Sequence, residues 1–193
     1  MDFGMYEYHV YEPKEGMYDG FMDRFPILFK EKDMYSTQTC LANGIECPYG
    51  WYRLLEETCT YLEMLNYEYI KYGLHVVAEQ VKEKMGTLCF YYRIDKSDDS
   101  CETIDPPTFC KVVEDCFKLK VRKIIDHAYR VSETICADCG TRLDEDNVRT
   151  TKPWINYVCK KCFDNRMENK KKFAESVEQK QHKKDKDDEN GKK

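Results

Sequence analysis

The architecture of this chain is set by two adjacent stretches, "WYRLLEETCTYLEMLNYEYIKYG" (Trp51–Gly73) and "LHVVAEQVKEKMGTLCFYYRID" (Leu74–Asp95). Apolar side chains recur in the first at spacings of three and four, which is typical of an amphipathic helix, and Gly73 suits its end. The second predicts a β-hairpin that turns near Gly86. The side chains expected to face the core are Trp51, Leu54, Leu55, Thr58, Leu62, Leu65 and Tyr69 of the helix, and Leu88, Phe90, Tyr92 and Ile94 of the second strand.

A second, longer helix is predicted on the C-terminal side of this hairpin. It should begin near Pro106 or Pro107, because proline is favoured in the first turn of a helix. We therefore predict an α+β fold, with helices packed on a small antiparallel sheet. The apolar stripe of the long helix is Phe109, Val113, Phe117, Val121, Ile124, Ala128 and Val131.

Composition divides the chain into four segments. Residues 1–23 form an acidic, tyrosine-rich arm that we expect to be irregular, and residues 24–134 form the α+β body. A cysteine-rich finger spans 135–163, and 164–193 is a charged tail, expected to be helical to about Gln181 and disordered beyond it.

The charge balance argues against a nucleic-acid-binding surface over most of the molecule. The 193 residues carry 31 Lys and Arg against 36 Asp and Glu, a net charge of −5. The tail holds 10 basic and 8 acidic residues, so the rest of the chain is net −7. A body this acidic repels a phosphate backbone.

Neither a secretory signal nor a membrane span is expected from the sequence. The N-terminus lacks a basic start followed by an apolar region, and no apolar run approaches about 18 residues. Eleven cysteines are an odd number, which argues against a complete disulfide framework. We therefore expect a cytoplasmic protein whose thiols are reduced.

Two cysteine pairs, "CADC" (Cys136 and Cys139) and "CKKC" (Cys159 and Cys162), are separated by 19 residues. This spacing is typical of a zinc site in which each pair forms a tight knuckle. Gly140 follows the first knuckle, where a positive φ is often needed. We expect Trp154, Ile155 and Tyr157 to cap the small core between the knuckles. Four thiolates leave no coordination position for water, so we predict one structural Zn²⁺ per chain and a zinc-ribbon or treble-clef-like finger.

Four motifs in the same order resemble an uncharacterised family of small proteins encoded by bacteriophages and prophages. They are "RFPILF" from Arg24, "CLANGIECPYGWYRLLEETC" from Cys40, "QVKEKMGTLCFYY" from Gln80, and the finger "CADCG…W…VCKKC". The resemblance implies a "GWY" helix start, a "VKEKxGxLxFY" hairpin and a terminal two-knuckle finger in a phage context, but no reaction. This chain departs from the family pattern at Met85, usually aromatic, at Cys89, usually basic, and at Cys162, often histidine.

Binding rather than catalysis is the function we favour at this point. The leading hypothesis is an accessory protein that engages a host or phage protein and in doing so inhibits a host enzyme or a defence system. The alternative is a zinc-ribbon regulator that binds nucleic acid through the finger and "KLKVRK" (Lys118–Lys123). An enzyme with an unrecognised site is a third class, although no catalytic set or phosphate loop stands out.

The remaining cysteines have no role that the sequence assigns. Cys40 and Cys47 flank a turn and could hold a second metal with a distant partner. The simpler interpretation is that such cysteines are small apolar residues of the core.

Overall fold

The computed structural model describes residues 16–97, 107–152 and 155–190, and the side chains of 16–97, 110–152 and 155–178. Its main elements are α1 (Tyr52–Tyr69), β1 (Leu74–Lys84), β2 (Thr87–Lys96), α2 (Pro107–Ser132), β3 (Val148–Thr150), β4 (Tyr157–Cys159) and α3 (Lys160–Asn190). The predicted α+β fold is confirmed, with two small antiparallel sheets, β1–β2 and β3–β4. Most of the acidic N-terminal arm, residues 1–15, lies outside the described residues.

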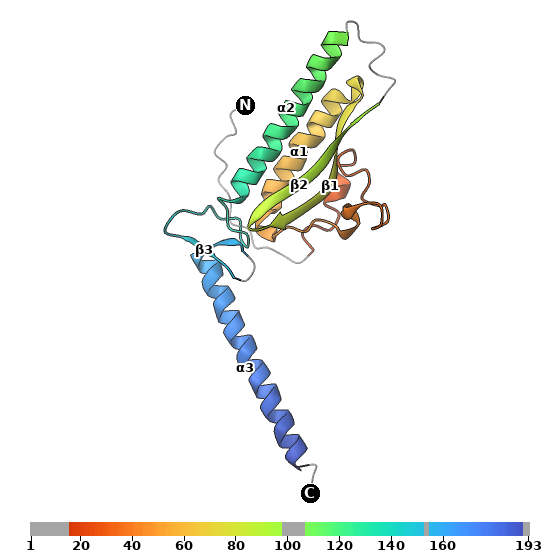
Figure 1. Cartoon of the computed structure of the whole chain (residues 1–193). Coiled ribbons are helices and arrows are strands. Elements are labelled where there is room, and N and C mark those ends of the chain that lie inside the picture. Colours follow the sequence, from red (N-terminus) through yellow and green to blue (C-terminus); the bar gives the residue numbers. More distant parts are fainter. Residues whose placement is uncertain (1–15, 98–106, 153–154, 191–193) are drawn as a thin grey trace.

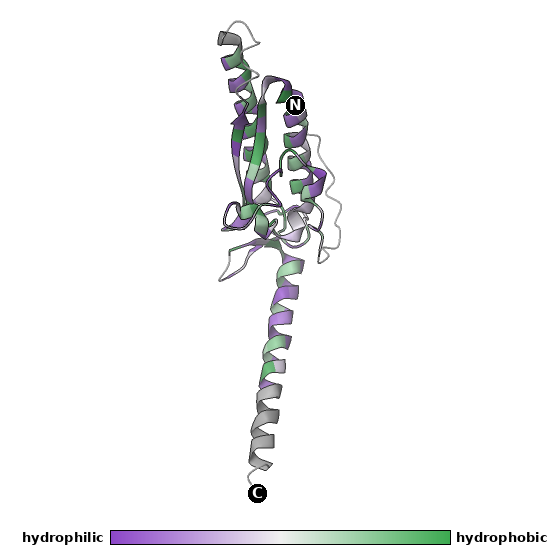
Figure 2. Cartoon of the chain, turned by 90° about the vertical axis from the view of Figure 1, so that its right-hand side faces the viewer, coloured by the Kyte–Doolittle hydropathy of each residue, from purple (hydrophilic) through white to green (hydrophobic). Residues whose placement is uncertain are grey.

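The body is a two-layer arrangement in which α1 and α2 pack on the β1–β2 hairpin (Figure 1). The apolar positions predicted for the first helix, from Trp51 to Tyr69, are all buried. On α2, Phe117, Val121 and Ala128 are buried, whereas the side chain of Phe109 lies outside the described residues. Apolar residues (green in Figure 2) alternate with hydrophilic ones (purple) along these helices, as the periodicity predicts.

Both ends of the hairpin have the backbone geometry that its sequence requires. After α1, one 3₁₀ turn (Ile70–Tyr72) leads to Gly73, which takes the left-handed conformation with φ 69°. At the other end Met85 and Gly86 both have positive φ, 54° and 86°. Positive φ at both central residues is the signature of the two-residue turn that matches the twist of antiparallel strands.

The outer edge of β1 is covered by the segment that precedes α1. Ala78 N donates to Leu28 O at 2.8 Å, and Glu46 pairs with Lys82 as an isolated parallel bridge. An edge covered in this way cannot pair with another chain. The described part of the expected arm also packs on the body, since Phe21 is only 1% exposed.

Two buried polar side chains of α1 anchor the neighbouring segments: Glu63 holds the covering segment, and Asn66 holds the start of β1. The Glu63 carboxylate accepts hydrogen bonds from Ile27 N and Leu28 N, both at 2.9 Å. Asn66 pairs with the backbone of Val76, accepting at 2.7 Å and donating at 3.0 Å. Buried polar groups are tolerated only when they are hydrogen-bonded, and both of these are.

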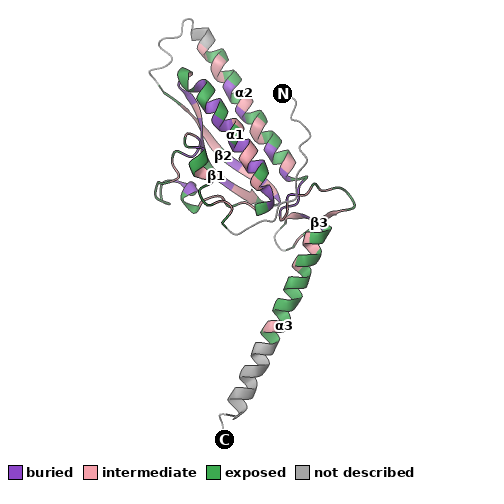
Figure 3. Cartoon of the chain, turned by 180° about the vertical axis from the view of Figure 1, so that it is seen from behind, coloured by how far each residue is buried: buried purple, intermediate pink, exposed green. Residues whose placement is uncertain are grey.

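A long helix, α3, extends away from the body (Figures 1 and 3). It continues to Asn190, past the expected helix end near Gln181. Ion pairs at i,i+4 spacing, Lys160–Asp164 and Lys172–Glu168, support a helix that has little packing of its own. Most of its described residues are exposed, as the green colour of the α3 ribbon in Figure 3 shows.

Candidate metal centre

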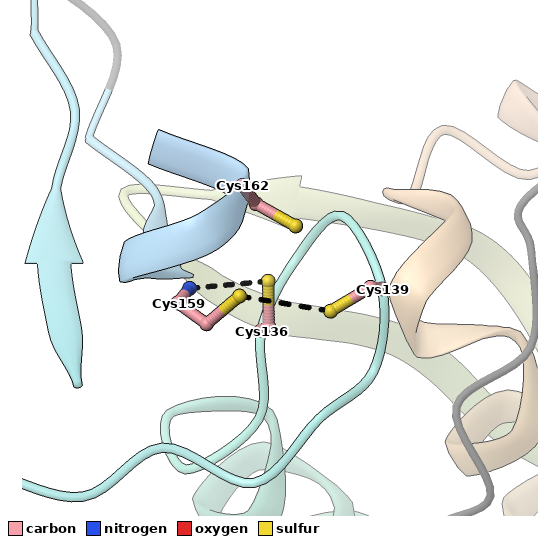
Figure 4. A group of neighbouring side chains, drawn as sticks. All are labelled: Cys136, Cys139, Cys159 and Cys162. Carbon is pink, nitrogen blue, oxygen red and sulfur yellow. Dashed lines mark hydrogen bonds between the residues drawn. The ribbon is translucent and has the colours of Figure 1, made fainter. Parts of the chain in front are cut away.

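The four sulfur atoms of Cys136, Cys139, Cys159 and Cys162 lie within 4.8 Å of one another. Figure 4 shows them pointing toward a common centre. The sulfurs of Cys139 and Cys159 are 3.8 Å apart. Four thiolates each about 2.3 Å from a tetrahedral ion would be separated by about 3.8 Å, so a small contraction of the cluster would close it around a metal.

Different local structures position the two pairs. Cys136 and Cys139 sit in a turn that is closed by Gly140 N donating to Cys136 O at 2.9 Å, and Gly140 has φ 73°, as predicted. Cys159 ends β4, and Cys162 lies in the first turn of α3. A knuckle, a β-hairpin and a helix that begins at the second pair form the treble-clef-like finger expected from the sequence.

The small core under this cluster differs from the one expected. Trp154, Ile155 and Tyr157 were the expected cap, but Ile155 is 38% exposed and Trp154 lies outside the described residues. The side chains packed around the knuckles are instead Ala137, Leu143, Val158 and Phe163. Because this core is so small, an ion bound by the thiols would contribute much of the stability of the finger.

The thiols differ in how readily they lose a proton. Burial raises the pKa of Cys136 to about 11 and also raises the pKa of Cys162. Burial acts on Cys139 too, but hydrogen bonds from the Thr141 hydroxyl and amide outweigh it, so the pKa of Cys139 is lowered. The Cys139 sulfur and the Thr141 hydroxyl oxygen are 3.2 Å apart, and Cys159 N donates to the Cys136 sulfur, also at 3.2 Å. Donors of this kind stabilise the thiolate form that ligates metals.

An ion pair beside the cluster was not foreseen from the sequence. Asp138, inside the first knuckle, accepts two hydrogen bonds from the Arg166 guanidinium of α3, one of them at 2.7 Å. The pKa of Arg166 is raised, first by Asp138 and further by Cys136 and Cys162. Arg166 therefore fixes the start of α3 on the knuckle and offsets the negative charge of the thiolates. No local motif marks this pair, because 28 positions separate its members.

The finger is also fastened to the body at two glycines. Gly50 N donates to Ala137 O at 2.9 Å, and a Cβ on Gly50 would lie 2.3 Å from the carbonyl oxygen of Cys136. At the hairpin turn, a Cβ on Gly86 would lie 2.8 Å from Cε2 of Tyr157. At Gly50 the neighbouring atoms are backbone, so this contact admits no larger side chain, whereas at Gly86 the neighbour is the side chain of Tyr157.

The other sequence candidates are not assembled into a site. Cys40 is exposed, and burial raises the pKa of Cys47 well above its usual range. Among the residues that the structure describes, the quartet is the only group of three or more ligand side chains that could hold a metal ion. In "KLKVRK", Lys118 pairs with Glu114 and Lys120 with Glu68, so two of its cations are already matched by carboxylates.

Comparisons of the chain with models of known protein families, with curated proteins and with solved structures found no match. Within its described ranges, the chain contains no helix long and apolar enough to cross a membrane.

Proposed function

We propose that this chain is a phage-type accessory protein that holds one structural zinc ion and acts by binding a host or phage protein. The observation that carries the metal part is the convergence of four sulfur atoms within 4.8 Å. Zinc is the ion best suited to a set of four thiolates in tetrahedral array. Because all four ligands would come from the protein, the ion would hold shape rather than activate water.

Metal analysis of the purified full chain tests this part directly. We expect about one Zn²⁺ per chain, and loss of that zinc in Cys139→Ser. Cys40→Ser is the matched control, because Cys40 is an exposed cysteine outside the cluster. Unchanged zinc content in Cys139→Ser would refute the assignment.

An exposed apolar strip on α1 supports the protein-binding part. Met64 and Tyr67 are each 61% exposed, and Ile70, just after α1, is 52% exposed. Their spacing of three makes them neighbours on the outer side of the helix. Tyrosine and methionine are enriched in protein interfaces, where a few such anchors dominate the binding energy.

Affinity capture from bacterial lysate, with or without phage infection, tests the partner. Tyr67→Asp should release the captured protein, whereas Tyr35→Asp should not, because Tyr35 is exposed but lies on a loop and is not part of the α1 strip. Equal capture by wild type and Tyr67→Asp would contradict the proposed surface. Recovery of bacterial or phage enzymes or defence factors would support the proposed context.

A nucleic-acid-binding regulator is the second candidate, and one observation favours it. Residues 148–178, which include the β3–β4 hairpin and the described side chains of α3, carry eight basic and four acidic residues. We nevertheless expect no DNA or RNA binding tighter than about 10⁻⁵ M at physiological salt, the usual non-specific range. Submicromolar binding that weakens steeply with salt in an anisotropy titration would establish this candidate instead.

A further inference from the structure

A groove runs between the end of β3 and the first turns of α3. Its volume is about 880 Å³, and it is lined by Thr150–Lys152 on the finger side and by a set that includes Phe163, Met167, Lys170 and Phe173 on the helix side. Met167 and Phe173 in this wall are 51% and 70% exposed. An apolar wall this open is suited to binding a peptide segment rather than to packing within the finger.

The charges around the groove are positive. Lys152 and Lys170 line it and are both exposed, whereas Arg166, which also lines it, is held by Asp138. The carboxylates of Asp164 and Glu168 on the same helix pair with Lys160 and Lys172. The groove therefore combines large apolar side chains with two available cations, which selects an acidic segment that carries aromatic or aliphatic anchors.

A second copy of the chain fits this groove poorly. An antiparallel pair of α3 helices that matched Met167 with Phe173 and Phe163 with Val177 would place Lys170 opposite Lys170. Burying two like charges at the centre of a small interface is unfavourable. Charge complementarity therefore favours an acidic occupant over self-association.

We propose that the occupant is the chain's own N-terminal segment, residues 1–15, bound within the same molecule. This segment has four acidic residues and one lysine, together with six large apolar or aromatic residues after Met1: Phe3, Met5, Tyr6, Tyr8, Val10 and Tyr11. It has the composition that the groove selects. The contact would make the groove a docking site for a terminal peptide, a role separate from the metal centre and from the α1 strip.

The point of attachment places the segment within reach. Tyr18 donates from its hydroxyl to Pro48 O at 3.0 Å and stacks on Tyr49 with ring centroids 5.8 Å apart. The next residue, Gly50, contacts the first knuckle through Ala137. Fifteen extended residues span up to about 50 Å. The distance along α3 from Lys160 to Phe173 is only about 20 Å.

Photo-crosslinking in the full-length chain tests the proposal. Phe173, which is exposed, is replaced by p-benzoyl-phenylalanine, and the crosslinked peptides are mapped by mass spectrometry. We expect the main product to join α3 to residues 1–15. Lys170→Glu should lower its yield about fivefold, in line with reversal of one partly exposed ion pair. Lys171→Glu is the matched control, because Lys171 carries the same charge on the same helix but does not line the groove.

The same experiment separates the alternatives. A mixture of ¹⁵N-labelled and unlabelled chains should give no mixed-isotope products. Mixed products, or crosslinks between two α3 helices, would overturn the proposal in favour of a second copy. Equal yields in Lys170→Glu and Lys171→Glu, or crosslinks only outside residues 1–15, would also overturn it. Zinc content is measured on the same samples. It tests the metal assignment separately, so a failure of the groove proposal can be told from a failure of the metal assignment.

Discussion

Gly50 N donates a hydrogen bond to the carbonyl oxygen of Ala137 at 2.9 Å, and this bond joins the start of α1 to the first cysteine knuckle. The approach is so close that a Cβ at Gly50 would lie 2.5 Å from that oxygen. The "GWY" element therefore begins α1 and also makes the backbone contact that holds the finger on the body. Body and finger should consequently respond to each other's perturbation.

The first prediction concerns substitution of Gly50. Gly50→Ala should lower the free energy of unfolding by about 1–3 kcal/mol, because the added methyl overpacks against two backbone carbonyls. Urea denaturation measures this loss. Hydrogen exchange should also quicken at residues 135–139 in this variant. Gly44→Ala is the comparison, because a Cβ there meets nothing within 4 Å and only its backbone is strained. Unchanged exchange at the knuckle in Gly50→Ala would contradict the coupling.

Metal removal is the second prediction. Chelation should speed amide exchange first in residues 135–163, because metal binding energy is folding energy in a small finger. The body contacts at Gly50 and Gly86 should loosen next, since Ala137 and Tyr157 hold them from the finger side. The strand pairing around Val81 and Phe90 should keep its protection. If all segments lost protection together, the finger and the body would be a single cooperative unit.

The third prediction concerns the sheet. Phe90 is 8% exposed and faces the core, whereas its neighbour Tyr91 is 43% exposed on the other face. Phe90→Ala should cost about 3–5 kcal/mol, the usual range for truncating a buried aromatic ring. Tyr91→Ala should cost much less, because most of its ring already contacts water. Thermal melts of the two variants measure this difference. Similar losses of stability in both would show the strand register to be wrong.

The fourth prediction concerns acid stability. The Arg93 guanidinium binds Glu31 and Asp95, and Lys30 also contacts Asp95 at 2.6 Å. Although burial opposes it, hydrogen bonding from Arg93 and Lys30 lowers the pKa of Asp95 to about 2, and Arg93 also lowers the pKa of Glu31. Carboxylates with a depressed pKa stabilise the fold above their unfolded-state pKa, and this contribution is lost as the pH falls through the folded-state pKa.

Stability should therefore fall between about pH 4.5 and pH 2 in the wild type. Arg93→Met should melt at a lower temperature at pH 7 and should lose less on acidification. Melting temperatures measured across this range provide the check. A constant difference between the two proteins at every pH would argue against the network.

The fifth prediction concerns the end of the chain. Residues 182–193 contain no apolar side chain, so they have nothing to bury. Deleting them should leave the melting temperature within about 1 °C of the full chain, because exposed polar segments contribute little to stability. A large loss would indicate a contact of this segment with the body.

The periodicity of the sequence was sufficient to predict the secondary structure of the body. Spacings of three and four placed Leu55 and Leu62 on the buried side of α1, and alternation placed Leu88 and Phe90 on the inner face of β2. Both patterns work because side-chain direction repeats with a fixed period in each element. The convergence of the four cysteines could also be predicted from their spacing, since two residues between thiols bring both sulfurs to one side of a tight turn.

Relations between distant segments depended on the tertiary structure. The bonds from Ile27 and Leu28 to Glu63, the pair Asp138–Arg166 and the contact of Gly50 with Ala137 each join positions 28 or more residues apart. No local period encodes such pairs, because their members lie in different elements and no fixed sequence spacing relates them. They arise only once packing of the apolar faces has fixed where the segments lie. The sequence thus determined the elements and the metal ligands, and tertiary packing decided how the finger is held on the body and which charges surround the groove beside α3.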